Sequence, residues 1–278
     1  MMKQPGQISI EHLQIRVGEG EQGFDAVQDV SINIAPGEFV CLLGPSGCGK
    51  STLLGALAGH LAPSRGSIRV DGKTVDGPHP ERGLVFQQHT LFPWQKVLEN
   101  VAFGLKMKGV PKAERERRAA ELLTMVGLDG FAGHYPAQLS GGMRQRVEIA
   151  RVLINDPRVM LMDEPFGALD AQTRMMMQQL LLDVWARIQT TIVFITHDID
   201  EALFLADRIL VMSPRPGRII DEIKLAFPRP RGPELVTTEA FMRYKRHCLE
   251  LLHPEHNGRP LDRLSPLGTP ASPLQFST

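Results

Sequence analysis

Hydrophobic and polar residues alternate with a period of two in the opening part of the chain. Residues 8–17 (ISIEHLQIRV) and 27–39 (VQDVSINIAPGEF) show this alternation, which is typical of strands with one buried and one exposed face. The run at 39–44 (FVCLLG) is apolar until its final glycine, and such a run predicts a strand buried on both faces. We therefore expect an antiparallel β region that leads into a buried central strand.

The hydrophobic period becomes helical in the middle of the chain. Apolar positions recur every three to four residues between Leu98 and Ile154, and Pro111 suits the start of one of the helices there. Strand patterns return at RVMLM and TIVFIT, with a helical pattern at 171–188 between them, which is the rhythm of a parallel sheet. The expected fold class is α/β, a mainly parallel sheet with an antiparallel β subdomain and a helical subdomain inserted at about residues 88–155.

The composition of the chain changes after Phe227. The stretch FPRPRGPE is rich in proline and predicts a linker, residues 238–252 predict one helix, and scattered prolines follow. We therefore expect one large domain over residues 1–227, followed at 228–278 by a linker, a short helix and a loosely ordered tail.

Charge and cysteine content restrict the classes of partner. Lys plus Arg and Asp plus Glu number 31 each, so no bulk positive field suggests nucleic acid or an anionic membrane as the partner, and the balance argues against nucleic-acid binding. The three cysteines form no CxxC pair and no disulfide framework, which favours a reducing cytoplasm. No apolar run reaches the roughly 18 to 20 residues that span a bilayer, so we expect any role at a membrane to come through a partner.

The stretch GPSGCGKST fits the phosphate-loop pattern GxxxxGK[ST] and comes directly after the predicted buried strand. Its glycines let successive backbone N–H groups and the following helix N-terminus point at a phosphate. Lys50 would reach the β- and γ-phosphates, and the Ser51 hydroxyl would bind Mg²⁺. The ATP-binding residues expected from this loop are Gly44, Pro45, Ser46, Gly47, Cys48, Gly49, Lys50, Ser51 and Thr52.

An apolar strand pattern, RVMLM, ends in two adjacent acids, Asp163 and Glu164. In a nucleotide site Asp163 would hold Mg²⁺ through its water shell, and Glu164 would accept a proton from the attacking water as general base. An acidic turn in solvent is the alternative for such a pair alone. The preceding phosphate loop favours the nucleotide site.

Two further strands end in polar residues, GLVF at Gln87 and TIVFIT at His197. Ligands of open parallel sheets bind at the carboxyl ends of the strands. Lys50, Gln87, Asp163 and His197 are therefore expected to converge on one site. Gln87 suits Mg²⁺ or the attacking water, and His197 suits hydrogen bonding to the γ-phosphate.

The stretch LSGGMRQR, residues 139–146, is a second candidate for anion binding. Ser140 can cap the following helix, and the amides of Gly141 and Gly142 would bind a phosphate. This loop belongs to the helical insertion, so its simplest role is toward the nucleotide of another copy of the chain. Two copies arranged head to tail would then share two nucleotides across a two-fold interface. An ordinary capped helix is the alternative.

Taken together, these motifs resemble the ATP-binding subunit of ABC transporters, over about residues 8–223. The set consists of GPSGCGKST, Gln87, LSGGMRQR, LMDEP, the ALD at 168–170 and His197. The resemblance implies a P-loop ATPase with ATP and Mg²⁺ as cofactors. It implies that the SGG loop clamps the γ-phosphate across a dimer, that Asp170 links the two sites, that Glu164 is the catalytic base and that His197 is the switch histidine. Met143 stands where Gln is commonest, which leaves the Ser140 and glycine contacts intact.

Family members usually stack adenine on an aromatic residue shortly before the position of Ala26. Here GEGEQGFDAV offers only Phe24, which becomes the candidate, with a core residue at the head of a strand as the alternative.

Longer segments of the chain resemble the import subfamily for nitrate, sulfonate and taurine. These segments are ERGLVFQQHTLFPWQKVLENVAFGLKMKGVPKAER, DEPFGALDAQTR, THDIDEA and MSPRPGRI. The resemblance favours taurine or an aliphatic sulfonate, with nitrate next. It implies a subunit on the cytoplasmic face of the plasma membrane beneath two membrane permease subunits, served by a periplasmic or lipid-anchored solute-binding protein. Residues 91–94 (LFPW) would contact a permease or pack inside the helical insertion.

Two other classes of protein share some of these motifs. A soluble ABC-type ATPase acting on DNA or ribosomes would usually carry two cassettes or a long coiled-coil insertion, and this chain shows neither. A P-loop kinase would leave LSGGMRQR without a purpose.

Overall fold

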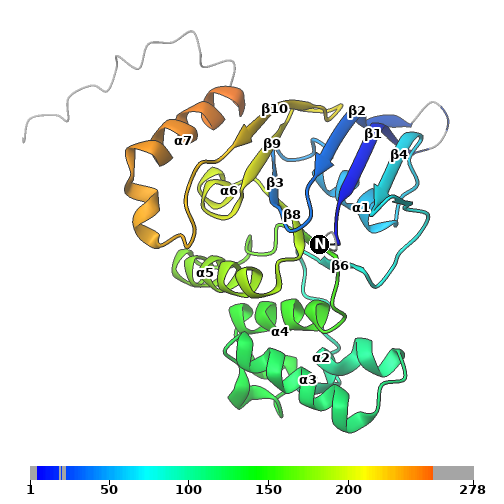
Figure 1. Ribbon diagram of the computed structural model, residues 1–278, viewed down its shortest axis with the longest axis vertical. Helices are drawn as coiled ribbons and strands as arrows, with labels where there is room; N and C mark the ends of the chain where they lie inside the picture. Colours follow the sequence, from blue (N-terminus) through cyan, green and yellow to red (C-terminus); the bar gives the residue numbers. More distant parts are fainter. Residues whose placement is uncertain (1–4, 19, 21–22, 253–278) are drawn as a thin grey trace, which may run out of the picture.

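Two β-sheets organise the part of the chain described by the computed structural model, residues 5–18, 20 and 23–252 (Figure 1). The first sheet has the order β2-β1-β4-β5 and is antiparallel throughout. Its strands are β1 (Ile8–Val17), β2 (Phe24–Ile34), β4 (Arg65–Val70) and β5 (Lys73–Thr74). It confirms the predicted antiparallel region.

The second sheet has the order β10-β9-β3-β8-β7-β6. Its strands run parallel except for β10, which pairs antiparallel with β9. They are β3 (Phe39–Leu43), β6 (Arg82–Val85), β7 (Val159–Asp163), β8 (Thr191–Thr196), β9 (Arg208–Met212) and β10 (Ile219–Lys224). Every residue of β3 and β8 is buried, as expected for strands covered on both faces.

The period-two alternation of β3 divides the interior into two cores. Phe39, Cys41 and Leu43 pack on the side of the helices α2 to α7, whereas Val40 and Leu42 pack toward α1 and the first sheet. The helices are α1 (Lys50–Ala58), α2 (Val97–Met107), α3 (Lys112–Met125), α4 (Gly141–Leu153), α5 (Ala171–Ile188), α6 (Ile199–Leu205) and α7 (Glu239–Leu252). Short 3₁₀ turns lie at Asp129–Phe131, Pro136–Gln138 and Pro233–Thr237.

Helices α2, α3 and α4 form a separate lobe at the bottom of Figure 1, beyond α5 and the larger sheet. They lie in the chain between β6 and β7. Asn100, fully buried, ties the start of α2 to its preceding loop by bonding the main chain of Phe92 at 2.8 and 3.1 Å. The architecture confirms the predicted fold class.

The proline-rich segment after Phe227 runs along the core. Arg231 is 4% exposed and donates hydrogen bonds to the carbonyls of Phe204 and Ala206, at 2.9 and 2.7 Å. The ring of Phe227 stacks on Phe241 of α7, with centroids 6.0 Å apart. Helix α7 agrees with the helix expected at 238–252. The tail expected to be loosely ordered lies, from residue 253, outside the described residues, and the division at residue 227 stays a prediction.

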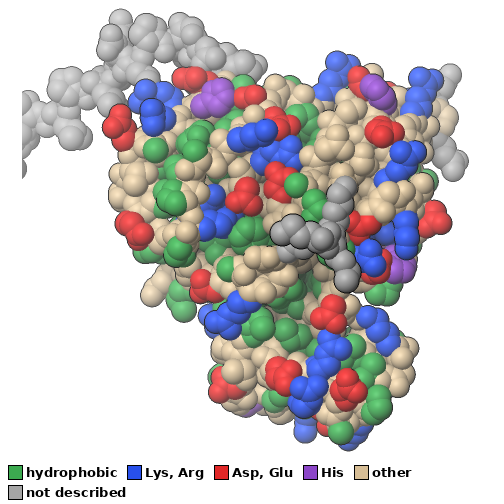
Figure 2. Space-filling view, in the orientation of Figure 1, with side chains coloured by type: hydrophobic (Ala, Val, Ile, Leu, Met, Phe, Trp, Pro, Cys, Tyr) green, Lys and Arg blue, Asp and Glu red, His purple; other side chains and the backbone are tan. Residues whose placement is uncertain are grey.

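Acidic and basic side chains are interspersed over the face drawn in Figure 2, without an extended patch of one sign. None of the helices in the described part of the chain combines the length and the apolar character needed to cross a bilayer.

Candidate active site

The strands β3, β8, β7 and β6 are parallel neighbours, and their carboxyl ends are level. Leu43 lies opposite Thr196, Asp163 opposite Ile195, and the end of β6 beside the end of β7. The loops that follow these strands carry the phosphate loop, His197, Glu164 and Gln87. The structure therefore brings together at one sheet edge the strand ends that the sequence predicted to converge.

The phosphate loop has the left-handed backbone that its glycines were expected to supply, with φ of +76° at Gly47 and +104° at Gly49. A Cβ on Gly49 would lie 2.5 Å from the carbonyl oxygen of Ala26, so no larger residue fits. Helix α1 begins directly after Gly49, with neither a capping side chain nor an acidic residue in its first turn. Its free N–H groups can therefore bind an anion.

Lys50 lies inside this loop. It is 5% exposed, and its ammonium donates hydrogen bonds to the carbonyls of Gly44 at 2.8 Å and Pro45 at 3.0 Å. Ser46 and Gly47 are exposed at the rim, and Thr52 continues α1. The thiol of Cys48 is buried in the core, so only its main chain can face a phosphate.

Ser51 and Asp163 form the expected pair of oxygen donors. The Ser51 hydroxyl donates to Oδ1 of Asp163 at 3.1 Å. Burial raises the pKa of Asp163, while the hydrogen bond from Ser51 acts in the opposite direction. Within the described residues no group of three His, Cys, Asp or Glu gathers to hold a metal. Gln87 is exposed and follows Phe86, the first residue after β6.

Glu164 and His197 are in direct contact, since Nδ1 of the imidazole lies 3.1 Å from Oε2 of the carboxylate. A carboxylate only accepts hydrogen bonds, so Nδ1 carries the hydrogen. The backbone of Glu164 is in the left-handed region at φ +43°, and its N–H is held by the carbonyl of Ile195 at 3.1 Å. Strain of this kind in a non-glycine residue concentrates at functional sites.

The SGG loop lies in the lobe of α2 to α4, away from α1 (Figure 1). Ser140 caps α4 as predicted, its hydroxyl oxygen accepting from the N–H of Met143 at 3.3 Å. Gly141 begins α4, and a Cβ on Gly142 would lie 2.7 Å from the side chain of Thr173. The second glycine therefore also permits close packing of α4 on α5.

Asp170 caps α5. Its carboxylate accepts from the N–H of Thr173 at 3.0 Å and from the Thr173 hydroxyl at 2.7 Å, and these hydrogen bonds lower its pKa. Because the same Thr173 packs beside Gly142, the ALD and SGG loops are neighbours within one chain.

Phe24 lies at the start of β2 and is 38% exposed, which excludes the core alternative. A residue that sequence reasoning missed, Arg215, places its guanidinium carbon 4.2 Å from the centre of the Phe24 ring. The same side chain contacts the carbonyl of Gly47 in the phosphate loop, at 3.3 and 3.4 Å.

A second missed residue, Arg174, connects two of the predicted loops. It donates to the carbonyl of Leu169, next to Asp170, at 3.0 Å, and forms an ion pair with Asp198, next to His197, at 3.3 Å. Arg174, Asp198, Glu164 and His197 all line a cavity of about 30 Å³.

We expect Arg174→Ala to lower kcat for ATP hydrolysis by roughly tenfold or more, because His197 and the ALD loop would lose a common anchor and small misplacements are costly. KM for ATP should stay within about twofold, since Arg174 touches none of the phosphate-loop residues. Steady-state phosphate release measures both constants. Arg174→Lys should restore part of kcat. A rise in KM as large as the loss of kcat, together with a lower thermal unfolding temperature, would contradict a positioning role.

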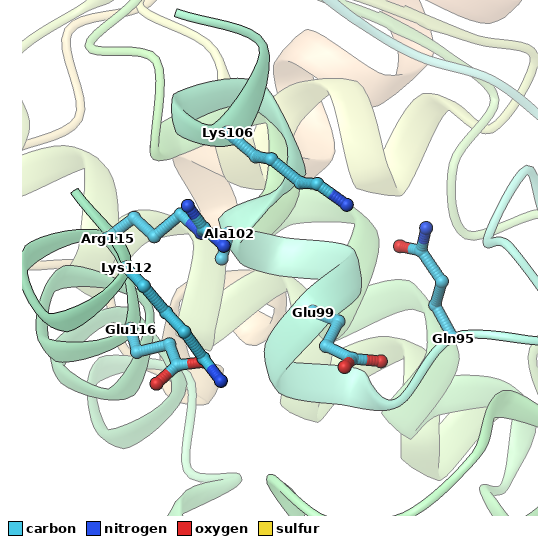
Figure 3. A pocket seen from close by; sticks show the side chains of 7 residues that line it. All are labelled: Gln95, Glu99, Ala102, Lys106, Lys112, Arg115 and Glu116. Carbon is cyan, nitrogen blue, oxygen red and sulfur yellow. The ribbon is translucent and has the colours of Figure 1, made fainter. Parts of the chain in front are cut away.

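A larger cavity, of about 310 Å³, lies between α2 and α3 (Figure 3). Lys106 comes from α2, whereas Arg115 and Glu116 come from α3. None of its lining residues belongs to the strand-end site, and its mixed charges favour no one ligand.

Comparison with known proteins agrees with this geometry. The ABC transporter family profile matches residues 27–167. The chain is 55% identical over 204 residues to the taurine import ATP-binding protein TauB of Rhizobium johnstonii. The matched segment covers 73% of this chain and 78% of the relative.

Two solved structures resemble this one. The first is a dimeric ATP-binding cassette in a post-hydrolysis state bound to ADP and Pi, with TM-score 0.69 and 36% identity, covering 80% of this chain and 100% of that chain. The second is cbiO1 of Clostridium perfringens, part of the ABC transporter complex cbiONQ, with TM-score 0.73 and 30% identity, covering 91% of this chain and 97% of that chain. This protein is therefore a member of the ABC transporter family, an ATP-binding subunit with ATPase activity.

Proposed function

We propose that this ATPase powers the import of taurine or a related aliphatic sulfonate, with nitrate as the next candidate solute. The observation that carries the proposal is the 55% identity to a subunit named for taurine import. The strand-end site with its complete set of motifs supports the role of an energising subunit.

The residues at the strand ends can divide the chemistry of hydrolysis among them. The amides of the phosphate loop and α1, together with Lys50, would bind the phosphates. Ser51, Asp163 and Gln87 would hold Mg²⁺, which would neutralise charge on the phosphates. Glu164 would accept the proton of the attacking water.

His197 adds a condition to this scheme. When Nδ1–H of a neutral His197 ring donates its hydrogen bond to Glu164, the other ring nitrogen, Nε2, can only accept a hydrogen bond. To donate to a γ-phosphate, the ring must be doubly protonated or exchange its contact with Glu164 when nucleotide binds.

A second copy would complete the site. The SGG loop lies in the other lobe of the chain, so it would reach a γ-phosphate only from a partner arranged head to tail. The solved cassette bound to ADP and Pi is a dimer, which supports a second copy as the partner. ATP would then favour the closed dimer, and hydrolysis would remove the bridge and open it.

Membrane permease subunits are the proposed second partner, at the cytoplasmic face of the plasma membrane. Beside Gln87, an apolar groove of about 340 Å³ is lined by Phe86, Phe92 and Phe103 among others. Within LFPW, Leu91 is buried and packs inside, whereas Trp94 is 71% exposed. Exposed aromatic residues around an apolar groove favour a protein contact. A separate solute-binding protein would deliver the solute to the permease from the other side.

Uptake of labelled taurine, an alkanesulfonate and nitrate, in cells lacking this gene, tests the proposal. We expect taurine or sulfonate uptake to be lost, to return with the wild-type gene and to stay absent with Lys50→Ala, because Lys50 is part of the phosphate loop. Normal uptake of all three solutes without the gene would overturn the import assignment. It would leave the ATPase activity of the purified chain to be explained by another solute or a soluble role.

A further inference from the structure

The loop of residues 213–218, which joins β9 to β10, is fixed against the nucleotide side of the molecule. The N–H of Gly217 donates to the carbonyl of Ala26, and the N–H of Gln28 donates to the carbonyl of Gly217, both at 2.9 Å. A Cβ on Gly217 would lie 2.1 Å from the carbonyl oxygen of Cys48. The loop is therefore wedged between the first residues of β2 and the phosphate loop.

Arg215 projects from this fixed loop and bridges two parts of the candidate site. Its guanidinium lies over the ring of Phe24, 4.2 Å from the centroid, and its Nε and Nη2 atoms point to the carbonyl of Gly47 at 3.4 and 3.3 Å. Arg215 is itself exposed. Two independent contacts thus hold a flat cation at the rim of the phosphate loop.

This position makes Arg215 part of the surface that a nucleotide base would meet. Phe24 is the only aromatic residue that the sequence predicted to stack on the base, yet the guanidinium of Arg215 already lies over its ring. Guanidinium groups stack on aromatic rings on both of their faces, and nucleic-acid bases stack on guanidinium planes. A base bound outside the phosphate loop could therefore be held by the arginine without displacing it.

We propose that Arg215 is a nucleotide-binding residue that stacks between the Phe24 ring and the purine base. Phe24 acts in this arrangement as the support that keeps the guanidinium flat, together with the carbonyl of Gly47. The inference rests on nucleotide binding at the phosphate loop and assigns a further residue to it.

The test compares binding of ADP with binding of pyrophosphate, because the two ligands differ by the adenosine group. Neither ligand has a γ-phosphate that the ATPase could remove. Isothermal titration on the full chain gives the dissociation constant of ADP, and competition against ADP gives that of pyrophosphate. We expect Arg215→Ala to weaken ADP binding by roughly three- to tenfold. Pyrophosphate binding should change by less than about twofold.

Three further variants sharpen the result. Arg215→Lys should weaken ADP binding nearly as much as Arg215→Ala, because an ammonium keeps the charge but not the plane. Phe24→Ala should also weaken ADP binding, and the double variant with Arg215→Ala should lose little more, as expected for residues that act as one unit. The matched control is Arg218→Ala on the same loop, whose side chain donates to Gln28 at 2.6 Å.

Each other outcome has a definite meaning. Unchanged ADP binding by Arg215→Ala would overturn the proposal, and tighter binding would overturn it and also show that the arginine must leave before the base binds. Equal losses for ADP and pyrophosphate would overturn it in favour of a phosphate contact. Failure of the wild-type chain to bind either ligand would instead contradict nucleotide binding at the phosphate loop itself.

Discussion

Replacing Glu164 by glutamine is expected to lower the rate of ATP hydrolysis by about a hundredfold or more, because an amide cannot accept the proton of the attacking water. The glutamine keeps the size of the side chain and can still bond to the ring of His197. ATP affinity should therefore stay near the wild-type value. Phosphate release at saturating ATP measures the rate, and equilibrium titration measures the affinity.

The matched control for this variant is Glu121→Gln. Glu121 forms an exposed ion pair with Arg117 on the surface of α3, at 2.6 Å, and exposed pairs of this kind contribute little. Its removal should leave hydrolysis unchanged. Near-normal hydrolysis by Glu164→Gln would exclude Glu164 as the general base, whereas loss of ATP binding would mean that its role is structural.

Replacing Ser140 by aspartate is expected to lower hydrolysis by roughly a hundredfold, because a second negative charge would stand where the γ-phosphate must approach. Aspartate is as good a helix cap as serine, so α4 and the thermal unfolding temperature should be preserved. The control, Ser140→Asn, also caps the helix but carries no charge. It should retain most of the activity.

A mixture of Ser140→Asp with Lys50→Ala separates a shared site from a site within one chain. If the SGG loop serves the partner's nucleotide, a mixed dimer contains one site with both changes and one site with neither. Equal mixing should therefore restore measurable ATPase activity, although each variant alone is inactive. Absence of any recovery, with mixed dimers shown to form, would contradict sharing of the site.

The sequence predicted the parts of this site that depend on local pattern. A buried run followed by GPSGCGKST defined both β3 and the phosphate loop, and the register of parallel strands then placed Asp163 and His197 near it. Ser140 could be recognised as a cap because capping depends only on the next three residues. These features need no knowledge of contacts between distant segments.

Arg215 and Arg174 could not be predicted in the same way. Arg215 meets Gly47 from 168 positions away, and nothing in the pattern of MSPRPGRI indicates which side chain will face the phosphate loop. For Phe24, the period of two gave no means to separate a core position from an exposed one, since it stands at the first residue of β2. Such contacts depend on how whole elements pack.

The most direct test of the account is the molar mass of Glu164→Gln by light scattering, with Mg-ATP and with ADP. The account predicts a dimer in Mg-ATP, because uncleaved nucleotide would bridge the phosphate loop of one copy and the SGG loop of the other, and a monomer in ADP. A chain that binds ATP yet keeps the mass of a monomer in both conditions would contradict the shared site.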